Sequence, residues 1–246
     1  MKVCAVIPAR YESSRFPGKP LVKILEKSMI QWVYERTARC PEIQKTVVAT
    51  DDKRIFEEVQ SFKGKAVMTS PHHKSGTDRI AEAIEVLQVD ADIVLNVQGD
   101  EPVLKTTMLE NLIEAFQDPT VQMATFKKEI FTREEIQDST IVKVVTDTKG
   151  NAIYFSRSPL PFNRDGIPVK YFKHIGIYGY RREFLLQYTS WPQTPLELAE
   201  QLEQLRVIEN GFNIRVIETK YQSLGVDLPE HIPLVEQILL EEGIEA

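Results

Sequence analysis

The stretch IPARYESSRFPGKPL, residues 7–21, follows a short apolar run at Val3–Ile7. The run stops at Pro8, which is typical of a buried strand, and in α/β proteins ligands bind beyond the carboxyl ends of such strands. Between residues 10 and 27 five basic side chains accompany two acidic ones, although the whole chain carries a net charge of −6. The stretch is therefore predicted to bind a chain of phosphates.

Arg10, Arg15 and Lys19 supply positive charge in this loop. Gly18 can adopt positive φ and so lets backbone N–H groups approach a ligand. The stretch is not the P-loop of ATPases, because Ser13 occupies the place of the first P-loop glycine and a proline follows the loop lysine. A solvated basic loop is the alternative, and the rest of the chain must decide between the two.

The composition restricts the class of protein. With 246 residues, 42% of them hydrophobic, the chain can bury a substantial core. The sequence pI near 5.4 argues against a general nucleic-acid binder. Cys4 and Cys40 form no CxxC pair, and no apolar run is long enough for a signal peptide or a membrane span. We therefore expect a cytoplasmic protein without membrane insertion.

The first part of the chain alternates between apolar runs and segments with helical periodicity. The runs predict strands at residues 3–7, 46–50, 66–69 and 93–97, each followed by apolar residues at helical spacing. Such alternation is typical of right-handed βαβ crossovers. We therefore predict a Rossmann-like α/β fold. It would have a mostly parallel sheet, helices on both faces, and a single domain over residues 1–246.

Two helix starts carry capping-box patterns. Ser28 with Gln31 opens the helix after the basic loop, and Thr194 opens a helix predicted over residues 195–209. The dipeptide Asn210-Gly211 is expected to end the second of these helices.

From residue 127 onward the pattern changes. Strand-like runs at 141–145 and 152–155 flank a turn at 147–151, which predicts a β-hairpin. The segments YFSRSPLPF and HIGIYGY, rich in aromatic residues, proline and glycine, follow. We therefore predict a β-rich insertion at about residues 127–183.

Acidic residues follow two of the predicted strands. The run at 93–97 ends in QGD, so that Asp100 lies just past a strand's carboxyl end. Mg²⁺ prefers one or two carboxylates plus substrate phosphates, and Gly99 lets the backbone come close to them. Asp100 is the candidate metal ligand, with a turn aspartate as the alternative. Asp51 or Asp52 is expected to cap the next helix, with ligand contact as the alternative.

The segment SPHHKSGTDR, residues 70–79, combines hydroxyl and amide donors with a cation. It can contact a ligand, or it can be a helix cap followed by a surface arginine. His72 and His73 are predicted to be surface residues, because neighbours on an extended segment point in opposite directions and cannot share a metal.

The stretch at 7–21 resembles the opening of the sugar-activating cytidylyltransferases, in particular those that act on 3-deoxy-manno-octulosonate (Kdo). The resemblance continues in the same order through ATDD, SGTDR, NVQGDEP, YFSRSPLP, HIGIYGY, LEQLR and GVDLPE, which begin at residues 49, 75, 96, 154, 174, 202 and 225. Nearly the whole chain is covered, and the resemblance implies an α/β fold of the nucleotidyltransferase or glycosyltransferase-A type. Glu26-Lys27-Ser28 departs from the Gly-Lys-Pro usual in the family, which changes one turn and leaves the predicted phosphate loop intact.

The resemblance implies functional residues in most of these segments. For catalysis it indicates Arg10, Arg15, Lys19, Asp100 and Asp227, with Mg²⁺ held by Asp100 and Asp227. For the nucleotide it indicates Pro8, Ala9, Arg10, Ser13, Arg15, Lys19, Ser75, Gly76, Arg79 and Gln98. For the sugar it indicates Arg157, His174, Tyr178, Glu203 and Gln204.

Structural alternatives remain open for several of these residues. Asp227 forms a capping-box-like pair with Glu230. Arg157 can lie on a hairpin surface, and His174 can be a hydrogen-bonded core histidine. Glu200, Glu203 and Gln204 can form the wet face of the helix at 195–209.

The implied reaction transfers CMP from CTP to the anomeric hydroxyl of Kdo, giving CMP-Kdo and pyrophosphate for lipopolysaccharide biosynthesis. The resemblance also implies a homodimer, with acceptor binding and dimerisation in the insertion. Other acceptors (8-amino-Kdo or sialic acid), a non-catalytic nucleotide-sugar sensor, and a glycosyltransferase that consumes a nucleotide sugar are the alternatives. The presence of Lys19, Asp100 and Asp227 argues against the sensor.

Overall fold

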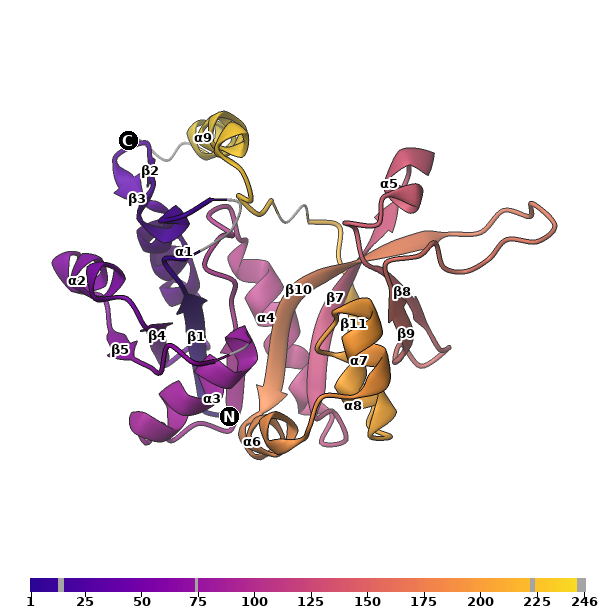
Figure 1. Ribbon diagram of the computed structural model, residues 1–246, viewed down its shortest axis with the longest axis horizontal. Coiled ribbons are helices and arrows are strands. Elements are labelled where there is room, and N and C mark those ends of the chain that lie inside the picture. The colour runs from indigo at the N-terminus through magenta and orange to yellow at the C-terminus, as the bar shows by residue number, and fades with distance from the viewer. Residues whose placement is uncertain (13–15, 74, 222–223, 243–246) are drawn as a thin grey trace. The chain divides into compact units, whose positions relative to one another are not determined.

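Packing divides the chain into two units, Met1–Ile113 with Gln222–Ala246, and Glu114–Tyr221 (Figure 1). The computed structural model describes residues 1–12, 16–73, 75–221 and 224–242. The second unit contains the whole of the predicted insertion at 127–183. The single domain over residues 1–246 stays a prediction.

Among the described residues, the first unit holds a four-stranded parallel sheet in the order β6–β1–β4–β5. Its strands are β1 (Val3–Ala9), β4 (Lys45–Thr50), β5 (Ala66–Met68) and β6 (Ile93–Asn96). Strand β1 pairs with both β4 and β6, and β5 pairs with β4. Every residue of β6 and all but one of β1 are buried. Strands covered on both faces read as continuous apolar runs, which is why the sequence revealed them.

Helices surround this sheet, as the fold class predicts (Figure 1). They are α1 (Met29–Ala38), α2 (Lys53–Ser61), α3 (Gly76–Val86), α4 (Thr106–Glu114) and α9 (Ile232–Glu241). Helices α1, α2 and α3 pack against the strands β1, β4 and β5. The predicted α/β class with a mostly parallel sheet is therefore confirmed.

Short elements follow the basic loop, and one more precedes α9. They are the 3-10 turns η1 (Lys19–Leu21) and η3 (Pro229–His231) and the hairpin of β2 (Lys23–Ile24) with β3 (Lys27–Ser28). Val235 and Leu239 of α9 pack in one buried cluster with Ile24 and Trp32. The C-terminal helix thus covers the segment that follows the predicted phosphate loop.

The two helix caps predicted in this unit have different outcomes. Asp52 accepts a hydrogen bond from Arg54 N–H at 2.9 Å and caps α2, as predicted. Ser28 is the residue before α1, but its hydroxyl is buried without a hydrogen-bond partner in the described structure. The Gln31 amide donates to Glu35 Oε1 at 2.8 Å instead. The capping box at Ser28 and Gln31 is therefore wrong, because Ser28 belongs to β3 and its side chain is packed inward.

The second unit contains a mixed sheet. Its strands are β7 (Met123–Ile130), β8 (Lys143–Thr146), β9 (Ala152–Ser156), β10 (Tyr171–Arg181) and β11 (Arg215–Glu218). Strand β7 pairs antiparallel with β10 and parallel with β11. Strands β8 and β9 form the predicted antiparallel hairpin. The helical segments are η2 (Ala115–Gln117), α5 (Arg133–Gln137), α6 (Arg182–Ser190), α7 (Pro195–Glu200) and α8 (Leu205–Glu209).

The helix predicted over residues 195–209 is broken in two. Gln201 has a left-handed backbone with φ of 55°, so α7 ends at Glu200 and α8 begins at Leu205. Glu197 forms a buried ion pair with Arg206 that joins the two short helices. The predicted end at Asn210-Gly211 is correct, because Asn210 follows α8 and Gly211 has φ of 80°. The prediction of an unbroken helix was wrong because a repeat of apolar residues does not reveal a single residue with left-handed backbone.

No helix in the described ranges combines the length and the apolar character needed to cross a membrane.

Candidate functional site

The loops that carry the predicted nucleotide residues meet at one edge of the parallel sheet in the first unit. Because β1 lies between β4 and β6, the segments after all three strands leave from the same edge. A Cβ atom on Gly99 would lie 3.0 Å from the Pro8 carbonyl oxygen, and one on Gly76 would lie 3.4 Å from the Pro8 ring. Glycine at both positions therefore allows the QGD loop and the start of α3 to pack against the end of β1.

Two adjoining pockets lie at this edge. One, of about 180 Å³, is lined by Pro8, Ala9, Arg10, Glu12, Lys19, Pro20, Gln98, Gly99 and Asp100. The other, of about 330 Å³, is lined by Arg10, Tyr11, Glu12, Asp51, Asp52 and Pro71. The first pocket thus brings together five of the ten predicted nucleotide residues, and Arg10 lines both pockets. Ser13 and Arg15 lie outside the described residues.

Lys19 joins the two predicted metal ligands. Gly18 has φ of 71° and precedes η1, so the predicted glycine turn places Lys19 at the start of a short helical turn. Lys19 Nζ lies 2.6 Å from Asp100 Oδ2 and 3.5 Å from Asp227 Oδ1. The lysine side chain is 15% exposed, against 29% for Asp100 and 43% for Asp227. A cation between two carboxylates offsets their mutual repulsion.

Asp227 does not have the capping role that the sequence left open. The residue before η3 is Leu228, with no side-chain cap. The Asp227 main-chain N–H donates to His231 Nδ1 at 3.2 Å, while its carboxylate faces Lys19. The backbone of Asp227 is therefore held by the turn that follows it, and its carboxylate is directed to Lys19.

The donor set suits a hard cation. In the described part of the chain, no three His, Cys, Asp or Glu side chains form a closed metal site. Asp100 and Asp227 instead form a pair of carboxylates bridged by one lysine. Mg²⁺ commonly takes one or two carboxylates and completes its shell with substrate phosphates and water. The two aspartates fit such an ion, whereas Zn²⁺ would require more protein ligands.

Arg10 organises the loop before α3. Its Nη2 atom donates to the main-chain oxygens of His73 at 2.6 Å and Ser75 at 3.2 Å. Ser75 Oγ in turn accepts from Asp78 N–H at 3.1 Å and caps α3. Part of the guanidinium predicted to bind phosphates thus holds the loop before α3, which carries the predicted nucleotide residue Ser75.

His72 and His73 have different surroundings. His72 is exposed, as predicted. His73 is half-buried and contacts the Glu82 carboxylate through Nε2, so its prediction as a surface residue was wrong. The error arose because Glu82 lies on α3, one element further along the chain.

Arg79 is completely buried, not on the surface. It donates to Asp51 Oδ2 at 2.7 Å and to Thr69 Oγ1 at 2.6 Å. This ion pair links the ATDD segment after β4 to the SGTDR segment in α3. Arg79 therefore supports the nucleotide loops from within the protein.

The predicted sugar residues all lie in the second unit. His174 and Tyr178 are on β10, with ring centroids 5.3 Å apart, and the Phe155 ring packs against His174 in a T-shaped arrangement with centroids 5.1 Å apart. Burial lowers the pKa of His174 to about 3 and raises the pKa of Tyr178 well above its usual value. Both side chains are therefore neutral near pH 7.

Hydrogen bonds around Thr125 identify the His174 tautomer. The Thr125 hydroxyl lies 3.0 Å from the Ile175 carbonyl oxygen and 2.9 Å from that of Ile177, and its single proton must serve one of them. His174 Nε2, 3.1 Å from Thr125 Oγ1, must then be the donor. Nδ1 carries the lone pair and can accept a hydrogen bond from a ligand.

Glu203 and Gln204 lie in the turn between α7 and α8. The Glu203 main-chain oxygen accepts from the Tyr188 hydroxyl at 2.9 Å. Gln204 is 4% exposed, and its Nε2 atom has no hydrogen-bond partner among the residues that the structure describes. The wet-face alternative is therefore wrong for Gln204, whose buried amide has a donor available for a ligand.

Arg157 follows β9 and is half-buried. Its Nε donates to the Glu200 main-chain oxygen at 3.0 Å, and its Nη1 donates to the Ser139 main-chain oxygen at 3.2 Å. Glu200, which the sequence assigned to a wet helix face, is thus a close neighbour of a predicted sugar ligand. No spacing pattern could have revealed it, because the contact joins a hairpin end to a helix end.

The chain resembles cytidylyltransferases over most of its length. The sequence model of the cytidylyltransferase family matches residues 4–218. A 3-deoxy-manno-octulosonate cytidylyltransferase of Geobacter metallireducens is 48% identical, over 97% of this chain and 98% of its own. The protein of the same name from Fusobacterium nucleatum is 47% identical over all of both chains.

Solved structures show the same similarity to cytidylyltransferases. A CMP:2-keto-3-deoxy-manno-octonic acid synthetase complexed with CTP superimposes with a TM-score of 0.93 and 44% identity, over 98% of this chain and 100% of that one. A 4-diphosphocytidyl-2C-methyl-D-erythritol synthase of Anaerococcus prevotii shares the fold, with a TM-score of 0.63 at 13% identity, over 97% of this chain and 96% of that one. The chain therefore belongs to the cytidylyltransferase family of nucleotidyltransferases, as its sequence motifs imply.

Proposed function

We propose that this chain transfers CMP from CTP to the anomeric hydroxyl of Kdo, releasing CMP-Kdo and pyrophosphate for lipopolysaccharide biosynthesis. The observation that carries the proposal is the Lys19–Asp100–Asp227 cluster at the carboxyl edge of the sheet. It occurs in a chain nearly half identical, over its length, to enzymes named for this reaction. The cluster has the charges that in-line nucleotidyl transfer needs, and no covalent enzyme intermediate is required.

On the nucleotide side, Asp100 and Asp227 would hold Mg²⁺. When bound, Mg²⁺ supplies Lewis-acid stabilisation of the α-phosphate and lowers the pKa of the attacking hydroxyl. Lys19 would then neutralise charge on the phosphates, together with Arg15 and the N–H groups of Arg10 not engaged with the loop at 73–75. Pro8, Ala9, Ser13, Ser75, Gly76 and Gln98 would contact the nucleotide, with the buried Arg79 supporting their loops.

On the acceptor side, Arg157 would pair with the carboxylate of the sugar acid, because a guanidinium matches a carboxylate in two-pronged geometry. The Nη2 group of Arg157 has no partner in the described ranges and Nη1 makes one hydrogen bond there, so one N–H from each of these two nitrogens is available. Gln204 would donate to a sugar hydroxyl, and Nδ1 of the neutral His174 would accept from one. Tyr178 and Glu203 would complete the sugar contacts.

The test is pyrophosphate release over a matrix of four nucleoside triphosphates and several sugar acids, with Kdo, 8-amino-Kdo and sialic acid among the acceptors. We expect CTP with Kdo and Mg²⁺ to give the highest rate. A purine should be poor, because a site that pairs buried polar groups with cytosine leaves them unpaired with a purine. If another triphosphate clearly outperforms CTP, the assignment is wrong. A preference for another sugar acid would correct the acceptor alone.

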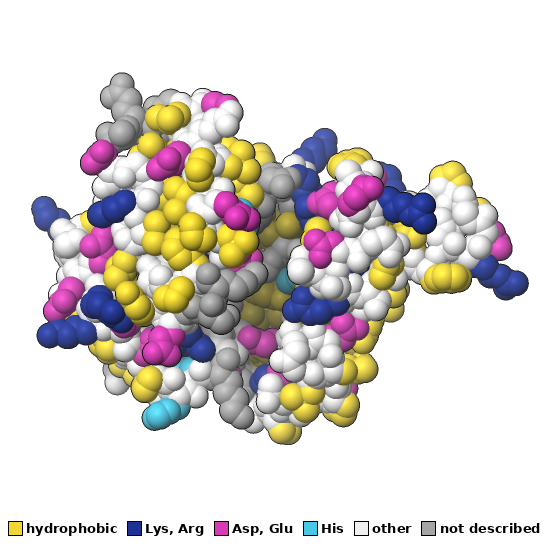
Figure 2. Space-filling view, turned by 45° about the horizontal axis from the view of Figure 1, so that its top comes forward, with side chains coloured by type: hydrophobic (Ala, Val, Ile, Leu, Met, Phe, Trp, Pro, Cys, Tyr) yellow, Lys and Arg dark blue, Asp and Glu magenta, His cyan; other side chains and the backbone are white. Residues whose placement is uncertain are grey.

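A second copy of this chain is the partner proposed for the second unit. Phe131 is 79% exposed, Phe162 is 87% exposed and Ile167 is 64% exposed. Figure 2 shows hydrophobic side chains on the loop that projects after β9. Apolar side chains this exposed are costly in water and support a homodimer. The free Cys4 and Cys40 support a cytoplasmic setting, where cysteines stay reduced. Light scattering would give the mass, and Phe162→Ser should shift it toward the monomer.

A further inference from the structure

Glu200, the last residue of α7, makes a set of contacts that its position in the sequence does not predict. Its Oε1 atom accepts from the Ser156 hydroxyl at 2.6 Å, and its Oε2 atom accepts from the Arg157 main-chain N–H at 2.9 Å. Its main-chain oxygen accepts from Arg157 Nε at 3.0 Å. One residue therefore fixes both the backbone and the guanidinium of Arg157.

The chemistry of these contacts requires a carboxylate. Ser156 Oγ also accepts from the Ser158 N–H at 3.0 Å, so its own proton is directed to Glu200. Two donors, an O–H and an N–H, thus converge on two oxygens that can only accept. An amide at this position would bring its own N–H group against one of these donors, because glutamine has one acceptor oxygen where glutamate has two.

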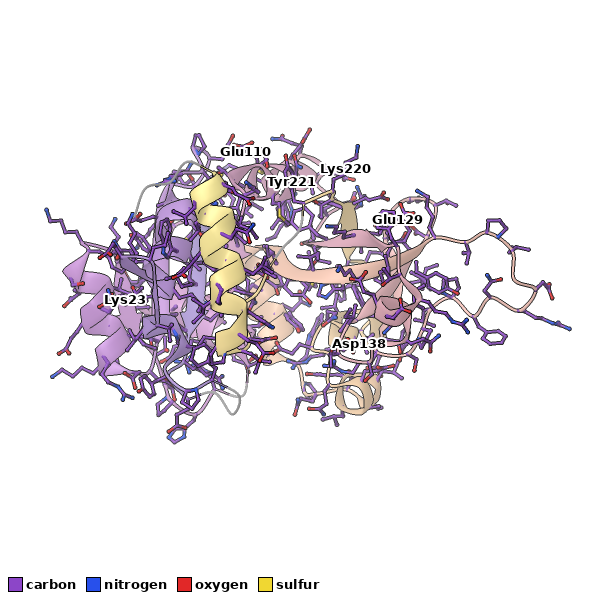
Figure 3. All side chains as sticks on the ribbon, turned by 90° about the horizontal axis from the view of Figure 1, so that it is seen from above. Lys23, Glu110, Glu129, Asp138, Lys220 and Tyr221 are labelled. Carbon is purple, nitrogen blue, oxygen red and sulfur yellow. The ribbon has the colours of Figure 1, made fainter. Side chains whose placement is uncertain are left out.

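A second anchor lies on the other side of the guanidinium. Arg157 Nη1 donates to the Ser139 main-chain oxygen in the loop that starts at Asp138, which is labelled in Figure 3. The buried Lys143 Nζ holds the same loop through the main-chain oxygens of Asp138 at 2.8 Å and Ile141 at 2.6 Å. With Nε and Nη1 fixed to protein oxygens, the plane of the guanidinium is set.

We propose that Glu200 is a positioning residue of the acceptor site, which holds Arg157 in the orientation that receives the carboxylate of the sugar acid. The inference rests on the proposed function and deepens it. Glu200 itself would touch neither substrate. It would reduce the rotational freedom of Arg157, so that less entropy is lost when the acceptor binds.

The test is a double-mutant cycle on the KM for Kdo, measured by pyrophosphate release at saturating CTP and Mg²⁺. Glu200→Ala should raise this KM by about 10- to 100-fold, the range expected from a small misplacement of a substrate-positioning group. The KM for CTP should change by less than about 2-fold, because Glu200 touches no nucleotide residue. In an Arg157→Ala background, Glu200→Ala should add less than about 2-fold, since residues that act through one another are not additive.

Glu209→Ala is the matched control. The Glu209 carboxylate accepts from Leu196 N–H at 3.1 Å and from Glu197 N–H at 3.3 Å, so it also ties main-chain donors of α7 to a neighbouring helix. It has no contact with Arg157 in the described structure. Its loss should lower the melting temperature and leave the KM for Kdo unchanged. Glu200→Gln, which conserves shape, should give an intermediate KM and keeps the test valid if the alanine variant does not fold.

Three results would overturn the positioning role. These are an equal effect of Glu200→Ala with and without Arg157, an equal rise in both KM values, or the same Kdo defect in the Glu209→Ala control. Failure of the proposed function looks different. The wild-type protein would then release no pyrophosphate from CTP and Kdo at all.

Discussion

The replacement Asp227→Asn tests the metal site most directly, because it removes one negative charge and keeps the shape of the side chain. In the structure the Asp227 carboxylate lies 3.5 Å from Lys19 Nζ and is 43% exposed. Asparagine preserves the main-chain N–H bond to His231. The change therefore separates the charge of Asp227 from its place in the turn.

The expected effect on stability is small. Lys19 keeps its closer partner, Asp100, at 2.6 Å, and an ion pair as exposed as that with Asp227 contributes at most about 1 kcal/mol. For a chain of this size, about 1 kcal/mol shifts the melting temperature by roughly 2–4 °C. Asp227→Ala should be as stable as Asp227→Asn, because Leu228 and not Asp227 precedes η3. A further loss of about 0.5–2 kcal/mol in the alanine variant alone would instead indicate a cap.

The expected effect on turnover is large. Loss of one charged group from the site where phosphate charge develops typically costs about 2.7–4 kcal/mol of transition-state stabilisation, or roughly 100- to 1000-fold in rate. The Mg²⁺ concentration for half-maximal rate should rise as well, because a hard cation loses one of its two carboxylates. The thermal shift caused by Mg²⁺ with CTP should also shrink, which reports binding without turnover.

The assay measures pyrophosphate release as a function of Mg²⁺ concentration, with melting temperatures recorded for each variant. Asp165→Asn is the control, because that aspartate is 81% exposed and lies in the second unit. An Asp227→Asn protein with wild-type turnover and unchanged Mg²⁺ dependence would remove Asp227 from the metal site.

Three further changes test separate parts of the site. Lys19→Met should fold and lose roughly 30- to 1000-fold in rate, since about 2–4 kcal/mol of phosphate stabilisation disappears, and normal turnover would assign the lysine to the solvent. Arg79→Met should lower the free energy of unfolding in urea by about 3–5 kcal/mol, because it leaves the Asp51 carboxylate facing the interior without its cation. Unchanged stability together with a raised KM for CTP would instead make Arg79 a direct ligand of the nucleotide. His174→Gln should flatten the loss of stability on acidification. The pKa of His174 is about 3 when folded and near 6.5 when unfolded, so between these values the unfolded chain binds the extra proton and stability falls as pH falls. Urea unfolding from pH 7 to pH 4 measures the difference between wild type and variant, and parallel curves would show that His174 is not buried in solution.

The first unit was predictable because its signals are local. Continuous apolar runs identified β1, β4 and β6, and each run ends at a proline, an aspartate or a QGD turn. Parallel pairing then brings the three loops together without further information. The same pairing explains how Lys19 and Asp100, 81 residues apart, come to lie in the one site that the family resemblance implied for them.

The second unit was less predictable because its strands are only partly buried. Strand β7 was missed, since its later residues Lys127, Lys128 and Glu129 are charged and read as a solvated segment. Lys127 extends over the Phe172 ring at 4.2 Å and donates to Thr146, so its aliphatic part lies along the sheet while its charge finds a partner. A pattern based on hydrophobicity cannot detect such a strand.

The roles of charged residues are even harder to predict from a sequence pattern. Arg10, Arg79 and Arg157 were all predicted to contact substrates, and in the structure each guanidinium donates to a protein oxygen. The sequence reveals a positive charge but not whether an acceptor within the chain lies close enough to take it. The extent of burial then distinguishes a supporting arginine from one that can still bind a ligand. Arg79 is fully enclosed and supports its loops, whereas Arg157 is half-buried with Nη2 unengaged in the described structure. An arginine that is held by some of its donors and keeps others available is preorganised for a carboxylate, because its orientation is fixed before the ligand arrives.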